Sequence, residues 1–253
     1  MLYYFKKGGV GMDHSEWIRE VPESKNAVLM VHGILGTPRH FDVFLPLIPG
    51  DWSVYNILLD GHGAKVTDFS RSSMKKWKAQ TAARLDDLLK RYDRVILVAH
   101  SMGTLFSLQE AAARPEKIAG LFLLQTPLRP RLKLRYACYS ALMPFGIVPK
   151  AAVDMSRGSS ITLSPWLWQY LGWIPRFAEL FIECRRTRKM LDQVTVPCRV
   201  FQSAKDEMVS MRTCRDLSKH PRLSVTVLPD SGHFAYHGAD LELLKTEFSK
   251  LFA

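Results

Sequence analysis

The chain has 253 residues, of which 47% are hydrophobic and 23% charged, and its formal net charge is +11. This composition is ordinary for a globular protein and excludes disorder as the main state. No stretch reaches the roughly 18 charge-free apolar residues that span a membrane, and residues 1–10 lack the apolar run of a secretory signal.

Short apolar runs alternate with helical patterns along the chain. Runs of this kind are typical of strands buried on both faces of a parallel sheet. Helical periodicity lies between them, at 73–91, 102–114 and 241–252, and the alternation predicts an α/β fold with a parallel sheet. The expected strands are 27–31 (AVLMV), 54–59 (VYNILL), 95–99 (VILVA), 121–124 (LFLL), 200–202 (VFQ) and 223–228 (LSVTVL).

The segment from 128 to 192 interrupts this alternation. It is aromatic and rich in proline, and between Arg129 and Lys189 it carries eleven basic and three acidic residues. We expect a helical insertion here, so that 1–127 and 193–253 form the core and 128–192 a cap. The charge excess favours contact with an anionic membrane surface or an acidic substrate, or it forms a solvated face. Its clusters are too discontinuous to indicate a nucleic-acid groove.

The pattern after the third run contains the clearest candidate for chemistry. A buried strand leads directly into His100, Ser101 and Met102 and then into a helix, with the small residues Ala99 and Gly103 on either side. A sharp strand-to-helix turn lifts a serine hydroxyl out of the sheet and strains its backbone. The alternative is a serine that only caps the helix.

This segment resembles the Gly-x-Ser-x-Gly elbow of the α/β-hydrolase superfamily, with alanine in place of the first glycine. The resemblance implies an α/β-hydrolase fold: a mostly parallel central sheet flanked by helices, with a helical cap inserted after the sixth strand. It makes Ser101 the nucleophile. The backbone N–H of Met102, at a helix N-terminus that favours negative charge, is then one oxyanion donor.

Two loops after earlier strands carry further marks of the family. Residues 32–36 (HGILG) resemble the HG-x-x-G loop of bacterial carboxylesterases and monoglyceride lipases. By that resemblance the N–H of Ile34 is the second oxyanion donor, and His32 is structural. Residues 60–63 (DGHG) resemble a turn that shapes the loop beside the active site in the same enzymes.

The last two strands are followed by candidates for the base and the acid. His233 lies in a Ser-Gly-His-Phe context that matches the family's histidine loop, and His237 is its nearest rival. Asp206 matches the family's Asp-x-x-Val segment, ahead of Glu207 and Asp230. In the implied mechanism Asp206 orients His233, which takes the proton of the serine hydroxyl.

The resemblance implies a serine hydrolase that cleaves carboxylic esters, like a carboxylesterase or monoacylglycerol lipase. Aromatic cap residues serve either as the cap's own core or as the lining of an apolar acyl pocket, for which the candidates are Trp166, Trp168 and Phe177. A thioesterase or lysophospholipase would use the same three residues. A non-catalytic binding protein on the same scaffold is the alternative from another class.

The remaining expectations concern cofactors and location. No HExxH motif or carboxylate cluster is present, so we expect no metal and no cofactor. The four cysteines are scattered without a CxxC pair, which favours reduced thiols in a cytoplasmic protein.

Overall fold

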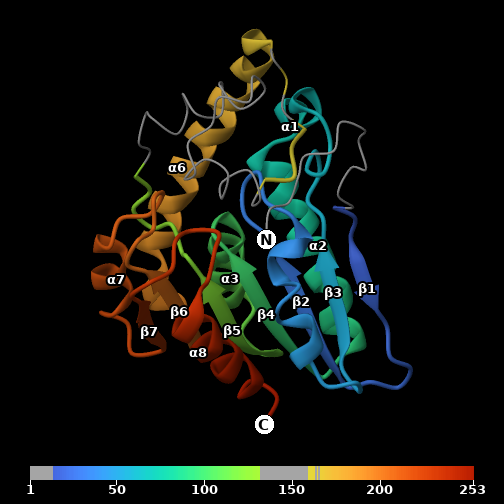
Figure 1. Cartoon of the computed structure of the whole chain (residues 1–253). Helices are drawn as coiled ribbons and strands as arrows, with labels where there is room; N and C mark the ends of the chain where they lie inside the picture. Colours follow the sequence, from blue (N-terminus) through green and yellow to red (C-terminus); the bar gives the residue numbers. More distant parts are fainter. Residues whose placement is uncertain (1–13, 132–158, 163, 165) are drawn as a thin grey trace.

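The computed structural model describes residues 14–131, 159–162, 164 and 166–253 (Figure 1). Its elements in chain order, with η for short 3-10 helices, are β1 (Trp17–Arg19), β2 (Asn26–Val31), η1 (Pro38–Phe41), η2 (Leu45–Leu47), β3 (Ser53–Ile57), α1 (Val66–Arg71), α2 (Met74–Arg91), β4 (Arg94–His100), α3 (Met102–Ala113), β5 (Ile118–Leu124), η4 (Leu167–Gly172), α6 (Trp173–Lys189), η5 (Leu191–Gln193), β6 (Cys198–Ser203), α7 (Arg212–Leu217), β7 (Leu223–Leu228) and α8 (Gly238–Ser249).

The strands form one sheet in the order β1-β3-β2-β4-β5-β6-β7. Strand β1 pairs antiparallel with β3, and all the other pairs are parallel. The mostly parallel sheet predicted from the sequence is therefore present. Because the parallel strands end at one edge, the loops after β2, β4, β6 and β7 meet there.

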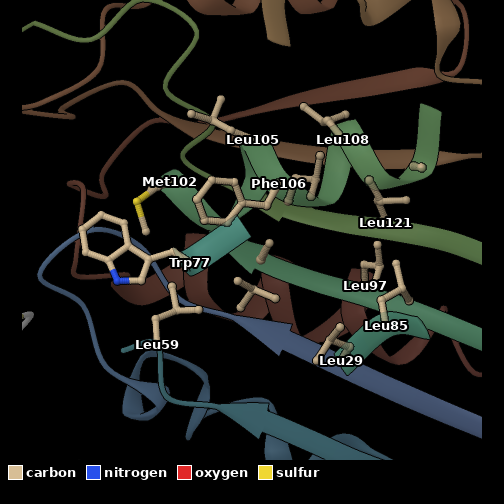
Figure 2. Packing of buried hydrophobic residues seen from close by; sticks show 14 of the residues in the cluster. Leu29, Leu59, Trp77, Leu85, Leu97, Met102, Leu105, Phe106, Leu108 and Leu121 are labelled. Carbon is tan, nitrogen blue, oxygen red and sulfur yellow. The ribbon is translucent and has the colours of Figure 1, made fainter. Parts of the chain in front are cut away.

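Alternate residues of each central strand point to opposite faces of the sheet, where two apolar clusters cover them. Leu29 of β2 packs in the cluster that includes Trp77 and Leu85 of α2 (Figure 2). Its neighbour Met30 packs in the other cluster, with Phe44 and with Phe248 of α8. The sheet is thus sandwiched between helices, which fixes the strand ends as a rigid platform.

The helix α6 of the expected cap is anchored to the core through a buried polar cluster. The Glu183 carboxylate accepts hydrogen bonds from Gln109 Nε2 of α3 at 2.8 Å and from Lys78 Nζ of α2 at 3.1 Å. Near the start of α6, Trp173 stacks edge-on against Phe69 of α1. Buried hydrogen bonds of this kind hold α6 against the core helices.

The cap differs in position from the expectation. Within the described residues it follows the fifth strand, β5, and not the sixth. The count is five because a single described strand, β1, precedes β2. The expected cap of 128–192 includes 132–158, 163 and 165, which lie outside the described residues, so the domain division stays a prediction.

Two strands differ from the sequence pattern because they lie at the edges of the sheet. Strand β1 was not predicted, since its three residues are short and mostly exposed. Strand β7 was expected to be buried on both faces, but as the other edge strand it exposes Ser224 and Val227.

Two further findings concern membrane spans and thiols. Among the described helices none is long and apolar enough to cross a membrane. Cys184, Cys198 and Cys214 are free thiols; Cys138 lies outside the described residues.

Candidate active site

Ser101 occupies the turn between β4 and α3 with φ 50° and ψ −122°. This is a strained conformation for a residue with a side chain. Its N–H donates to Leu124 O of β5 at 2.8 Å, which fixes the turn against the neighbouring strand. Gly103 lies so close to the strand β2 that a Cβ there would collide with the carbonyl oxygen of Val31. The small residue flanking the serine is therefore required by backbone packing.

The imidazole of His233 reaches the serine from the loop after β7. Its Nε2 lies 3.0 Å from Ser101 Oγ, and its Nδ1 lies 2.8 Å from Asp206 Oδ2. All three residues are buried. Since a carboxylate only accepts, Nδ1 carries the proton and Nε2 is free to accept from the hydroxyl. The structure brings the three sequence-predicted residues into one hydrogen-bonded line.

The loop after β6 carries the two neighbouring carboxylates of Asp206 and Glu207, which accept hydrogen bonds from different backbone groups. Asp206 Oδ1 accepts from the N–H groups of Met208 and Val209, each at 2.7 Å. Glu207 Oε2 accepts the backbone N–H of His233 at 3.0 Å. Sequence reasoning had considered Glu207 only as a rival acid and missed this contact, which no local pattern encodes.

The backbone of His233 is fixed on its carbonyl side as well. His100 Nε2 donates to His233 O at 2.9 Å, and the two rings pack edge to face. Burial holds the pKa of His100 well below its ordinary value, so the ring is neutral at physiological pH. The same loop is tied to α8, where Asp240 Oδ2 accepts from Ser231 Oγ at 2.7 Å.

The loop that carries Ile34 approaches the serine at Gly33, and Met102 follows the serine in the chain. Gly33 packs so tightly that a Cβ on it would lie 2.7 Å from Ser101 Cβ. The loop turns back through Gly36 N–H to Gly33 O at 3.0 Å. Within the part of the chain that the structure describes, neither Ile34 N–H nor Met102 N–H donates a hydrogen bond. The Met102 side chain is buried among the apolar core residues (Figure 2).

Two buried histidines lock the loop that carries Ile34. His32 Nε2 accepts from Leu59 N–H at 3.1 Å, and its Nδ1 donates to Gly33 O at 2.8 Å. His62, in the 60–63 turn, accepts Leu35 N–H on Nε2 at 3.1 Å. Burial lowers the pKa of His62 to about 4 and that of His32 well below its ordinary value. Both rings are therefore neutral and serve as structural acceptors.

The rivals for the base and acid lie elsewhere. His237 is exposed at the start of α8. Asp230 is exposed and pairs with Lys205 at 2.8 Å. No described contact joins either residue to Ser101.

The three expected pocket residues lie at η4 and in α6. Trp166 and Trp168 are 55% and 60% exposed and stack on each other with ring centroids 4.8 Å apart. Phe177 packs on the apolar core beside Trp173. No described contact joins any of the three to Ser101 or His233, and their role in binding substrate stays a prediction. Among the described residues no group of three His, Cys, Asp or Glu side chains could hold a metal.

Comparison with known proteins agrees with this architecture. A family model described as "Alpha/beta hydrolase family" matches residues 28–244. No curated protein matches the sequence. A structure of a metagenome-derived lipolytic enzyme is 21% identical, with a TM-score of 0.73, over 94% of this chain and 97% of its own.

Two further solved structures are similar over nearly their whole length. A monoacylglycerol lipase from Paleococcus ferrophilus is 16% identical, with a TM-score of 0.66, over 95% of this chain and 98% of its own. A structure from a study of carboxylesterases of Nitrososphaera gargenis is 17% identical, with a TM-score of 0.64, over 94% and 92%. At such identities these likenesses show the fold alone.

Proposed function

Because the chain belongs to the alpha/beta hydrolase family, we propose that it is a serine hydrolase that cleaves carboxylic esters through an acyl-enzyme on Ser101. The observation that carries the proposal is the line from Ser101 Oγ through His233 to Asp206, with separations of 3.0 Å and 2.8 Å. A serine that only capped the helix would not need a buried imidazole and carboxylate behind it. Its hydroxyl also makes no capping hydrogen bond to α3.

In the first step, Ser101 Oγ attacks the ester carbonyl carbon while His233 Nε2 takes its proton. Asp206 keeps the Nδ1 proton in place and stabilises the imidazolium that forms. The carbonyl oxygen becomes an oxyanion, which Ile34 N–H and Met102 N–H stabilise at the positive end of α3. The tetrahedral intermediate collapses when the alcohol leaves with a proton from His233.

In the second step, water attacks the acyl-enzyme with His233 again as base. The same two N–H groups stabilise the second oxyanion, and the acid product leaves with Ser101 restored. Every proton transfer in the cycle passes through His233 Nε2. The hydrogen bonds to the backbone of this residue therefore help to position the group that carries every proton.

The substrate class is proposed from the solved relatives. The relatives named above are described as a lipolytic enzyme, a monoacylglycerol lipase and carboxylesterases, so we expect an ester with an apolar acyl group. A thioester substrate would use the same residues, and another similar structure is described as a thioesterase domain from a biosynthetic pathway.

A fluorophosphonate probe tests the reaction class directly. We expect labelling at Ser101 that Ser101→Ala abolishes and that Ser107→Ala, further along α3, retains. A folded protein that takes up no label would contradict the proposal and favour a binding protein. A series of p-nitrophenyl esters of increasing acyl length, with matched thioesters, then identifies the substrate class; exclusive preference for acetate would exclude an apolar acyl pocket.

A further inference from the structure

A pocket lies between the chain that leaves β5, the second half of α6 and the start of α7, which Figure 1 shows next to each other. It has a volume of about 690 Å³. None of its lining residues belongs to the line of Ser101, His233 and Asp206. Five of them are arginines: Arg129, Arg131, Arg185, Arg188 and Arg212.

Among the residues that the structure describes, Arg129 is the one of these five that forms an ion pair with an acidic side chain. Arg129 binds Asp216 of α7 with both ends of its guanidinium, at 2.5 Å and 3.0 Å, and this ion pair lowers the pKa of Asp216. Arg131, Arg185, Arg188 and Arg212 form no ion pair among the described residues, although the charge of Arg188 also helps to lower the pKa of Asp216.

Other arginines of α6 show that partners are available on this helix. Arg176 pairs with Glu179 at 2.9 Å, and Arg186 lies 4.0 Å from Glu183. Of the basic residues of α6 without an ion pair among the described residues, Arg185 and Arg188 line the pocket and Lys189 does not. Among the described residues, no acidic side chain lines the pocket with them.

Five arginines line this one pocket, and Asp216 is the acidic side chain that pairs with one of them. Like charges repel one another, and an anion in the pocket would relieve that repulsion. A single carboxylate offers two oxygens, which suits one bidentate arginine. A phosphate group presents more acceptor oxygens and more charge, so it can bind several arginines together. We propose that this pocket binds a phosphate group.

The phosphate has two chemically equivalent sources. One is a free phosphate compound. The other is a lipid headgroup, since Phe181 and Ile182 expose apolar side chains at the same pocket. The proposal rests on the pocket alone and not on hydrolysis, because no lining residue takes part in the proposed reaction.

Binding is measured on the full chain carrying Ser101→Ala, so that turnover cannot interfere. Inorganic phosphate is titrated by calorimetry in a chloride buffer. The pocket variant is Arg185→Gln with Arg188→Gln. The matched control is Arg186→Gln with Lys189→Gln, which removes the same charge from the same helix but from residues that do not line the pocket.

We expect the pocket variant to weaken phosphate binding by at least ~10-fold and the control by less than ~2-fold, as loss of charge-assisted hydrogen bonds predicts. In a parallel arm, flotation of phosphatidylcholine vesicles with and without phosphatidate reports the headgroup. Binding only to phosphatidate vesicles, with the same loss in the pocket variant, identifies a lipid source. Equal weakening in both double variants, or no binding of either probe, would overturn the proposal, whether or not Ser101 takes up the fluorophosphonate.

Discussion

His233 is held at three points, two from the loop after β6 and one from the end of β4. Asp206 binds its ring, Glu207 accepts its backbone N–H, and His100 donates to its backbone carbonyl. The two backbone contacts set where the ring sits, and the ring contact sets its tautomer. An error of about 1 Å in the position of a catalytic group costs up to roughly 100-fold in rate. Loss of a backbone contact to His233 should therefore lower the rate measurably.

Because Asp206 contacts the ring and Glu207 the backbone, we expect substitutions of these two neighbouring acids to lower kcat by different amounts. Asp206→Asn is expected to lower kcat on the order of 10⁴-fold, because the wrong tautomer is favoured. Glu207→Ala is expected to lower kcat only about 10-fold, through loss of position. Glu207→Gln keeps an acceptor oxygen and restores most of the rate. Steady-state kinetics with a p-nitrophenyl ester check both; an equal loss from Asp206→Asn and Glu207→Ala would mean that the acid has been assigned wrongly.

At the scale of elements, the turn between β4 and α3 depends on how closely the helix approaches β2. The approach places α3 with its N-terminus beside Ser101, so that the helix dipole acts where negative charge develops. It is possible only because position 103 has no side chain that would meet Val31 O. The glycine therefore serves packing between two elements, and helix propensity alone would favour alanine.

Gly103→Ala tests this balance. Overpacking costs about 1–3 kcal/mol, and we expect the upper end because the obstacle is backbone. The helix propensity of alanine offsets about 1 kcal/mol of it, so the expected net loss in the free energy of unfolding is about 2 kcal/mol. The control is Gly50→Ala, where a Cβ meets nothing within 4 Å. Urea unfolding measures both; a Gly103→Ala protein as stable as the control would refute the packing argument.

At the scale of the whole molecule, three buried histidines make folding sensitive to acid. Burial lowers the pKa values of His32, His62 and His100. At a pH below the ordinary pKa of histidine, these three side chains bind protons in the unfolded chain but stay neutral in the folded chain. The free energy of unfolding therefore falls as the pH falls from about 6.5, and for His62 this loss is complete near its folded pKa of about 4.

The contribution of His62 to the pH dependence of the free energy of unfolding is large enough to measure separately. A shift from 6.5 to about 4 corresponds to about 3 kcal/mol of stability, present above pH 6.5 and lost towards pH 4. In His62→Gln, the amide oxygen can still accept from Leu35 N–H, but the side chain no longer titrates. Urea unfolding between pH 4.5 and 6.5 should thus show a flatter slope than wild type. His237→Gln, at an exposed site, should keep the wild-type slope, and an unaltered slope in His62→Gln would contradict this account.

The sequence alone determined the features that depend on neighbours along the chain. Apolar runs marked the central strands from β2 to β6, because strands buried on both faces must be apolar throughout. The small residues around Ser101 marked the strand-to-helix turn, since local backbone geometry demands them. The loops of Ile34, Asp206 and His233 resembled those of one family because each is defined by a short contiguous motif.

Only the tertiary structure decided which groups meet across segments that are distant in the chain. The contact of Glu207 with the backbone of His233, the exposure of Trp166 and Trp168, and the edge positions of β1 and β7 have no local signature. The basic excess of the cap was countable in the sequence, but not which of its arginines line one pocket together with Arg212 of α7. The physical reason is that these properties depend on how the elements pack. Packing brings together charges and hydrogen-bonding groups from distant segments, and the number of residues between two segments does not tell how close they lie in space.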